Sequence, residues 1–468
     1  MNLDDTIVAI ATPPGRGGIG VVRIAGSAAA TIALPMLRLT HDLQPGRAVL
    51  GQLIDIADSP MTIGTSSVQT EHSSTAHIDD VVVSYFAKPH SYTTDDVIEI
   101  SAHGSPIVLQ HIVEMAIARG ARLAEPGEFT MRAFLNGRID LTQAEAVRDL
   151  IDSQTLFQAK VAAQQLDGAL AHRLQPTKQK LVELIALLEA GIDFAEDDVS
   201  VVPDHQILQR IDALHQPLEE LLASFAYGKV VHEGLTLAIV GRPNVGKSSL
   251  FNRLVERERA IVTATPGTTR DLVTETVSIS GIPVKLVDTA GIRHALDEVE
   301  SIGIRKSREA LADADLVLVV LDSSQPISPQ DCELMAQLNG RPAILVQNKL
   351  DIHSSHFGLA DCRLVSVRTS AITGEGIAEL RGQILQHVAG PNTVLREPGF
   401  LTNVRHRNLV GHSVDALNAA RSAVSNRVPH EMLLLDLYNA LRPLDEITGA
   451  TTNDDILNLI FSTFCIGK

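Results

Sequence analysis

The sequence has few cysteines, no long apolar run and no long basic run. Its three cysteines, Cys332, Cys362 and Cys465, are odd in number and far apart, which argues against a disulfide framework and favours a reducing compartment. No apolar run approaches the roughly 20 residues that a membrane-spanning helix needs. The opening MNLDDTIVAI has two aspartates where a secretory signal peptide carries positive charge. We therefore expect a soluble, cytoplasmic protein with no membrane segment.

The scarcity of basic runs limits what the surface can bind. The net charge is −17 over 468 residues, so nucleic acid needs a local basic surface to bind. The short runs NVRHRN (403–408) and IRKSR (304–308) are more typical of solvated surfaces than of RNA sites. The sequence therefore locates no RNA-binding surface. Its length allows for about three domains with their own cores.

The residue pattern changes along the chain. Up to about residue 135, β-type runs at 21–26, 78–86 and 96–102 accompany one helical stretch at 106–120, which predicts an α+β domain. The Ser- and Thr-rich run 59–77 lacks periodicity and predicts a surface loop.

Two helical blocks follow, at about 138–232 and after 395. Their apolar residues recur at helical spacing and form one stripe per helix. The stripes are Leu181, Leu184, Ile185 and Leu188; Val410, Val414, Leu417 and Val424; and Leu457, Ile460, Phe461 and Phe464.

Between the helical blocks, strands alternate with helices and carry nucleotide-binding motifs. The strand LTLAIV (235–240) runs into GRPNVGKSS (241–249), whose glycines let backbone N–H groups surround phosphates. Lys247 would neutralise phosphate oxygens and Ser248 would ligate Mg²⁺. Two further strands end in KLVDTAG (285–291) and in VSVRTSA (365–371). In the first of these, Asp288 would hold magnesium through water and the backbone N–H of Gly291 would donate to the γ-phosphate.

The run AILVQNKLD (343–351) indicates which base is bound. The carboxylate of Asp351 can accept two hydrogen bonds from the N1–H and exocyclic amine of guanine, whereas adenine offers it an acceptor. Two charge-assisted bonds give about 10² to 10⁴ in discrimination. Four motifs in order, each after an apolar strand, predict a GTPase domain at about 234–392 with a doubly wound, mostly parallel sheet.

This GTPase pattern departs from the Ras type. Ile292 stands where Ras-type enzymes have the glutamine that orients the attacking water. In the loop TATPGTTRD (263–271), Thr269 is a candidate Mg²⁺ ligand. The side-chain oxygen of Asn244 can meet a monovalent cation that does the work of an arginine finger. The residues leave open whether such a cation binds or whether Arg270 and Asp271 form a plain ion pair.

Long motifs then resemble one family, the tRNA-modification GTPases called MnmE or TrmE. The resemblance covers nearly the whole chain. It rests on TIVAIATPPGRGGIGVVRIAG (6–26), EPGEFTMRAFLNGRIDLTQAEAVRDLIDS (125–153), GRPNVGKSSLFN, TATPGTTRD, DTAGIR, DEVESIGI and the closing CIGK.

The resemblance implies a multidomain α/β layout, with a P-loop GTPase domain inserted in an all-helical domain and an α+β folate-binding domain before them. The implied domains are 1–137 for folate binding and dimerisation, 138–232 and 393–468 for the two helical segments, and 233–392 for the GTPase. It further implies a homodimer and modification of C5 of the wobble uridine in certain tRNAs. The one-carbon unit would come from a tetrahydrofolate derivative, of 5-formyl or 5,10-methylene type. The FAD-containing partner protein would join in a hetero-oligomer.

By motif position, the resemblance also implies the ligands of GTP and of two metal ions. Potassium would be bound by Asn244, Thr263, Thr265 and Thr268, and magnesium by Ser248 and Thr269. Glu300 matches the general base acting through water, although without the resemblance an acidic-loop residue would be expected to be solvated. The GTP-binding residues would be Asn244, Val245, Gly246, Lys247, Ser248, Ser249, Thr263, Ala264, Thr265, Pro266, Gly267, Thr268, Thr269, Asp288, Thr289, Ala290, Gly291, Asn348, Lys349, Asp351, Ser370 and Ala371.

The closing FSTFCIGK (461–468) raises a separate question. Gly467 and Lys468 fit a prenylation signal poorly, and a free cysteine usually packs as a small buried residue. In the resembled family this tail reaches the folate pocket, which implies a catalytic thiolate at Cys465. Both alternatives for Cys465 stay open. The implied folate-binding residues are Arg23, Glu99, Arg138, which departs from the family's lysine, and Lys468.

The sequence leaves one competing function. A GTPase that binds RNA as a ribosome-assembly factor would share the nucleotide motifs but would need no pterin pocket. A pure scaffold with a degenerate nucleotide site fits less well, because Lys247, Ser248 and Asp288 are all present. Folate binding separates the first two functions, and GTP turnover excludes the third.

Overall fold

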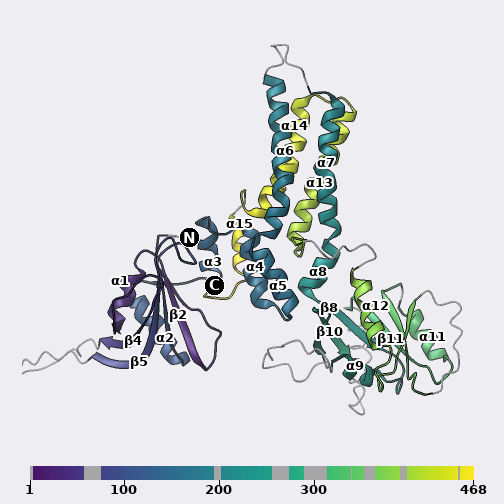
Figure 1. Cartoon of the computed structure of the whole chain (residues 1–468), viewed down its shortest axis with the longest axis horizontal. Helices are drawn as coiled ribbons and strands as arrows, with labels where there is room; N and C mark the ends of the chain where they lie inside the picture. The colour runs from purple at the N-terminus through teal and green to yellow at the C-terminus, as the bar shows by residue number, and fades with distance from the viewer. Residues whose placement is uncertain are drawn as a thin grey trace, which may run out of the picture. The chain divides into compact units, whose positions relative to one another are not determined.

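The computed structural model forms two compact units, residues 1–145 with 449–468 and residues 146–448. Figure 1 shows the chain coloured along its length. The structure describes residues 4–56, 75–193, 202–255, 274–288, 314–338, 340–352, 364–389, 398–451 and 454–467. The domain boundaries at 137, 232 and 392 stay predictions.

The first unit is built on a seven-stranded sheet with the order β3-β4-β5-β6-β2-β1-β7. Its neighbouring strands are antiparallel except for β1 and β7. The predicted strands and helix are confirmed, but Thr75–His77, predicted as loop, begin β5, because they pair with the end of β4. The elements are β1 (Ile7–Ile10), β2 (Gly17–Ala25), α1 (Ala29–Ala33), η1 (Leu34–Met36), β3 (Leu37–Leu39), β4 (Ala48–Ile56), β5 (Thr75–Phe86), β6 (Val97–Gly104), α2 (Pro106–Ala118), β7 (Arg122–Leu123), α3 (Glu128–Leu135) and α15 (Asp454–Phe461).

Alternating side chains of β6 separate two small cores in this unit. Ile98 and Ile100 are buried in the core that α1 and α2 help to form. Val97 belongs to a second core with Phe129 of α3. This alternation follows from the two-residue period of a strand. It leaves α3 beside the strands that carry Arg23 and Glu99.

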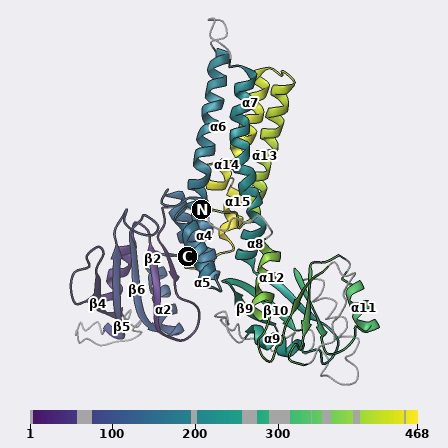
Figure 2. The ribbon, with the colours of Figure 1, turned by 45° about the vertical axis from the view of Figure 1, so that its right-hand side comes forward.

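The second unit contains a helical bundle drawn from both helical blocks. Helices α13 and α14 pack on each other, and they also pack on α7 and α6 respectively; Figures 1 and 2 show the four side by side. The predicted stripes of α6 and α13 lie in one buried core, as expected. The helices are α4 (Leu141–Asp152), which begins in the first unit, α5 (Leu156–Leu166), α6 (Ala169–Asp193), α7 (Asp204–Ala223), α8 (Phe225–Glu233), α13 (Val404–Ser425) and α14 (His430–Thr448).

The same unit contains a six-stranded sheet with the order β13-β12-β11-β8-β10-β9. All neighbours are parallel except β9 and β10, so the predicted mostly parallel sheet is confirmed. Apolar clusters cover it on both faces. Its elements are β8 (Leu235–Val240), α9 (Lys247–Val255), β9 (Thr274–Ile279), β10 (Ile282–Asp288), β11 (Leu316–Asp322), α11 (Pro329–Ala336), β12 (Ala343–Asn348), β13 (Val365–Arg368) and α12 (Ile377–Ala389).

The strand order reverses at β8, which pairs with β10 on one side and β11 on the other. In open α/β sheets, ligands bind beyond the carboxyl ends of the strands at such a reversal. The loop 241–246 follows β8 at this point. Among the described helices, none is long and apolar enough to cross a membrane.

Candidate functional site

The loop after β8 has the backbone shape that phosphate binding requires. Gly241, Asn244 and Gly246 have φ values of +155°, +64° and +95°, a region that L side chains other than asparagine rarely adopt. A Cβ on Gly241 would lie 2.4 Å from the carbonyl oxygen of Val320. Glycine is therefore required here both for the turn and for the close approach to β11.

Lys247 and Ser248 stand in the first turn of α9. The Lys247 ammonium donates to the carbonyl oxygens of Gly241 and Arg242, at 2.9 and 2.7 Å, which holds it over the loop. A helix N-terminus beside a glycine-rich loop favours anions. Asp288 ends β10 and pairs with Ile239 of β8, so its backbone lies at the same edge of the sheet.

Asn348 ties the guanine motif to the phosphate loop. It is 1% exposed, and its Nδ2 donates to the carbonyl oxygen of Val245 at 3.0 Å. Its Oδ1 accepts from the backbone N of Ala371 at 3.0 Å. One buried amide thus joins three of the predicted nucleotide segments.

The other two residues of this motif have polar partners of their own. The Ser370 hydroxyl donates to Oδ1 of Asp351 at 2.5 Å, which orients the carboxylate. Lys349 has a left-handed backbone, φ +72°, and its ammonium lies 2.7 Å from Oδ2 of Asp322. Burial raises the pKa of Asp322, but hydrogen bonds from Lys349 and Ser324 outweigh it and leave the pKa below its usual value.

Part of the predicted site lies outside the described residues. This applies to the whole of 263–269, to Thr289, Ala290 and Gly291, and to Glu300 and Lys468. All the predicted potassium and magnesium ligands, Asn244 and Ser248 included, and the general base therefore stay predictions. The phosphate loop and the guanine motif lie within the described residues.

In the first unit, the register of the sheet brings together two predicted folate residues. Antiparallel β2 and β6 set Arg23 directly opposite Glu99. Nε and Nη2 of Arg23 lie 2.8 and 2.7 Å from Oε1 of Glu99. Their side chains are 15% and 26% exposed, so the pair is only partly solvated.

Two aromatic rings lie near Arg23. The Arg23 guanidinium lies 5.8 Å from the ring centroid of Tyr92 and 5.5 Å from that of Phe129. Arg138, a third predicted residue, lies 5.4 Å from the same Tyr92 centroid and donates to the carbonyl oxygen of Ser91. Burial raises the pKa of Tyr92. Two cations thus share one ring.

The C-terminal tail contacts this cluster. Nη1 of Arg23 donates to the carbonyl oxygen of Gly467 at 3.2 Å. Gly467 has φ +97°, and a Cβ there would lie 2.4 Å from the carbonyl oxygen of Ile10. Phe464 is buried whereas Cys465 is exposed. The alternative that Cys465 is a buried packing residue is therefore wrong.

Sequence reasoning missed several residues of both sites. Asp322 ends β11, a strand that was not predicted, although its run LVLVVLD is apolar and ends in a carboxylate like KLVD. Tyr92 stands in a stretch without strand or helix periodicity and carried no signal. Apart from these two sites, the carboxylate of Asp79 lies 2.6 Å from Nδ1 of the exposed His103, and this ion pair raises the pKa of His103.

Comparisons with known proteins match nearly the whole chain to one family. A family model described as the MnmE helical domain matches residues 141–465, and one described as the GTP-binding protein TrmE N-terminus matches 6–138. The tRNA modification GTPase MnmE of Koribacter versatilis is 66% identical over the whole of both chains. That of Aquifex aeolicus is 41% identical over 99% of this chain and 100% of its own. The solved structure of Aquifex aeolicus Era bound to GDP and AlF4⁻ is 26% identical, covers 39% of this chain and 66% of that chain, and has a TM-score of 0.28.

Proposed function

Because the chain belongs to the MnmE family of tRNA modification GTPases, we propose that its GTP hydrolysis drives modification of C5 of the wobble uridine in certain tRNAs. The one-carbon unit comes from a tetrahydrofolate derivative of the 5-formyl or 5,10-methylene type. An FAD-containing partner protein takes part in the same reaction. The chain acts as a homodimer formed through its N-terminal domains.

One observation carries the folate part of the proposal. Arg23 donates at once to Glu99 and to the carbonyl oxygen of Gly467, and Cys465 two residues earlier is exposed. An exposed thiol can act as a nucleophile once it loses its proton. This cluster gives the tail a chemical role that packing alone does not require.

The residues present suit a folate. Arg23 and Arg138 offer guanidinium donors for the carboxylates of a glutamate tail. Both N–H bonds from Arg23 go to Oε1 of Glu99, so Oε2 takes no part in that pair and can accept from the donor edge of a pterin. The folate, when bound, supplies the one-carbon group. Lys468 adds a further cation to this site.

At the nucleotide site, each motif residue has one role. Lys247 and the loop N–H groups bind phosphate, Ser248 and Thr269 hold Mg²⁺, and Asp351 accepts from guanine. Asn244 and the backbones of Thr263, Thr265 and Thr268 bind K⁺, which stabilises charge on the phosphates as an arginine finger would. Glu300 acts as the general base through water. Potassium binding accompanies pairing of two GTPase domains across their nucleotides.

The nucleotide part is tested by GTP hydrolysis in potassium and in sodium buffer at matched ionic strength. In parallel, size-exclusion chromatography in the presence of a transition-state mimic measures the apparent mass of the protein. We expect strong stimulation by potassium and an increase in apparent mass on pairing. Equal rates in the two salts would remove Asn244 from a cation site. Glu300→Ala should keep GTP binding and lose hydrolysis.

The folate part is tested by titrating 5-formyltetrahydrofolate into the full chain. We expect saturable binding that Arg23→Gln and Arg138→Gln each weaken. Arg16→Gln, in the loop before β2, is the matched control. No binding to the wild-type chain would refute the one-carbon role and favour a ribosome-assembly GTPase.

A further inference from the structure

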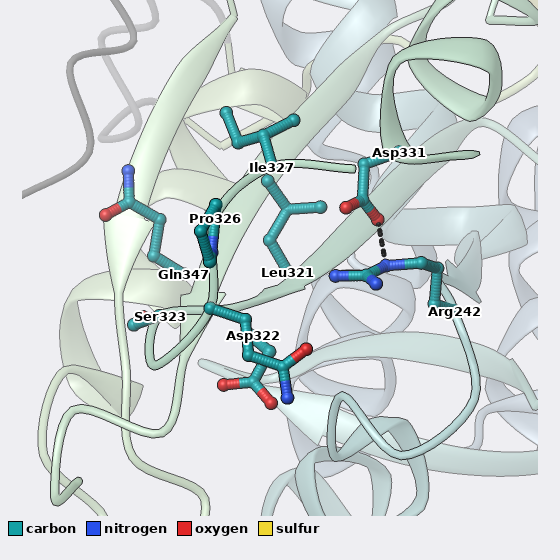
Figure 3. A pocket seen from close by; sticks show the side chains of 9 residues that line it. Arg242, Leu321, Asp322, Ser323, Pro326, Ile327, Asp331 and Gln347 are labelled. Atoms are coloured by element: carbon teal, nitrogen blue, oxygen red, sulfur yellow. Dashed lines mark hydrogen bonds and ion pairs between the residues drawn. The ribbon is translucent and has the colours of Figure 1, made fainter. Parts of the chain in front are cut away.

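Two buried carboxylates lie on one segment of the GTPase domain, and each faces a cation from a different nucleotide-binding loop. Asp322 ends β11 and Asp331 stands in the first turn of α11. Their exposed fractions are 5% and 1%. Figure 3 shows both acids lining one pocket. Neither acid belongs to the nucleotide motifs.

Asp331 joins this segment to the phosphate loop. Its Oδ1 lies 2.8 Å from Nε of Arg242, the residue after Gly241, as the dashed line in Figure 3 marks. Its Oδ2 accepts from the backbone N and the hydroxyl of Ser328, both at 2.9 Å. The capping box at the start of α11 therefore fixes the carboxylate, and its other oxygen holds Arg242.

Asp322 joins the same segment to the guanine motif. Its Oδ2 lies 2.7 Å from Nζ of Lys349. Its Oδ1 accepts from the backbone N and the hydroxyl of Ser324, at 2.9 and 2.6 Å. Lys349 has a left-handed backbone between Asn348 and Asp351. A fixed partner for its ammonium helps to hold that unusual conformation.

We propose that Asp322 and Asp331 are positioning residues for nucleotide binding. Asp331 holds the phosphate loop in place through Arg242, and Asp322 holds the guanine loop through Lys349. Each buried carboxylate needs its cation beside it, because an unpaired buried charge is strongly unfavourable. The segment from β11 to α11 thereby ties the two loops to each other.

The test compares GDP and IDP affinities of Asp322→Asn and Asp331→Asn in the full chain. IDP lacks the exocyclic amine of guanine, so the ratio of the two affinities reports how well Asp351 is positioned. For Asp331→Asn we expect both affinities to fall about tenfold with the ratio unchanged. For Asp322→Asn we expect GDP to lose about tenfold and IDP less, so that the ratio falls.

The matched control is Asp315→Asn. Asp315 precedes the other end of β11, and its carboxylate accepts from the backbone N of Thr236 at 2.8 Å. The substitution replaces this charged acceptor by a neutral amide oxygen beside the same strand. Its GDP and IDP affinities should equal those of the wild type. If Asp322→Asn and Asp331→Asn behave like this control, the two acids only stabilise the fold and the proposal is wrong.

Arg242→Gln gives a second route should Asp331→Asn not fold. It leaves the capping box of Ser328 and Asp331 intact and removes the cation from the loop. The variant should reproduce the tenfold loss with an unchanged GDP to IDP ratio, and Arg242→Lys should restore part of the affinity. Wild-type affinity in Arg242→Gln would contradict the role of Asp331. Circular dichroism confirms that each variant is folded.

Discussion

The nucleotide site and the N-terminal site are assembled in opposite ways. In the nucleotide site, the residues follow the carboxyl ends of parallel strands, where the sheet itself gathers them. In the N-terminal site, Arg23 reaches across 76 residues to Glu99 and across 444 to Gly467. The first site depends on backbone shape at a few glycines and on buried side-chain contacts between its loops, whereas the second depends on Arg23, which contacts both a neighbouring strand and the C-terminal tail.

The N-terminal unit also relies on buried charge. Glu128, which is fully buried, receives bonds from Arg122 at 2.5 Å and Arg132 at 2.9 Å. Both arginines also pair with Asp5. This network begins α3, the helix whose Phe129 lies against Arg23. The comparison therefore predicts that loss of a buried charge destabilises the N-terminal unit, whereas a change of backbone shape at a glycine weakens ligand binding at the site where that glycine lies.

The largest expected effect is that of Glu128→Gln. It leaves two arginines short of a buried partner, which costs about 3–5 kcal/mol of unfolding free energy. Chemical denaturation followed by circular dichroism measures the change. GTP binding should persist, because the GTPase domain has its own core. Unchanged stability would show that the network is not needed for the fold.

Glu128→Gln should also change how the stability depends on pH. Burial raises the pKa of Glu128, but hydrogen bonds from Arg122, the backbone of Glu125 and Arg132 outweigh it, so the pKa is lowered. The stabilisation is therefore present above the unfolded pKa of about 4.3 and is lost as the pH falls through the lower folded value. Glu128→Gln should remove this part of the acid-induced loss of stability.

Gly246→Ala comes next. A Cβ at this residue would lie 2.3 Å from Nδ2 of Asn348, whose amide is buried and bonded on both sides. Strain at φ +95° adds to this clash, so we expect about a 30-fold loss of GTP affinity, equivalent to about 2 kcal/mol. Gly340→Ala, at φ +77° with no atom within 4 Å of its Cβ, is the control for strain alone and should keep wild-type affinity in a fluorescent-nucleotide titration.

Gly467→Ala applies the same test to the N-terminal site. Its Cβ would meet the carbonyl oxygen of Ile10 at 2.4 Å, so the tail must shift away from Arg23. We expect about a tenfold loss in 5-formyltetrahydrofolate affinity with unchanged GTP hydrolysis. Gly137→Ala, with φ +73° and open space, is the matched control. Equal folate affinity in both variants would separate the tail from the folate site.

The smallest effect is expected at the junction before the GTPase domain. Nε2 of His232 lies 2.8 Å from Oδ1 of Asp149, and this hydrogen bond raises the pKa of His232 despite opposing burial. The stabilisation is thus complete below the unfolded pKa of about 6.5 and is lost as the pH rises through the raised value. The thermal stability of His232→Gln should not show this loss as the pH rises. An identical pH profile in both proteins would mean that the pair contributes nothing.

Local motifs alone could predict residues of the nucleotide site but not those of the N-terminal site, for a physical reason. Lys247, Asn348 and Asp351 could be predicted because strand-end motifs of fixed spacing act locally. Arg23 and Glu99 could be selected only through a family resemblance, since their pairing depends on the register of β2 and β6. Tyr92 could not be selected, because its role arises from tertiary contacts that no spacing reports. Asp322 carried a signal that was missed, a carboxylate at the end of the apolar run LVLVVLD.

One measurement tests most directly whether the C-terminal tail takes part in the proposed one-carbon chemistry on tRNA. Cys465→Ser and Cys332→Ser, both at exposed cysteines, are compared with the wild type for GTP hydrolysis and for wobble-uridine modification in the presence of folate and the FAD-containing partner. We predict that all three hydrolyse GTP alike and that Cys465→Ser alone fails to modify tRNA. Full modification by Cys465→Ser would contradict the account and leave the tail with a structural role.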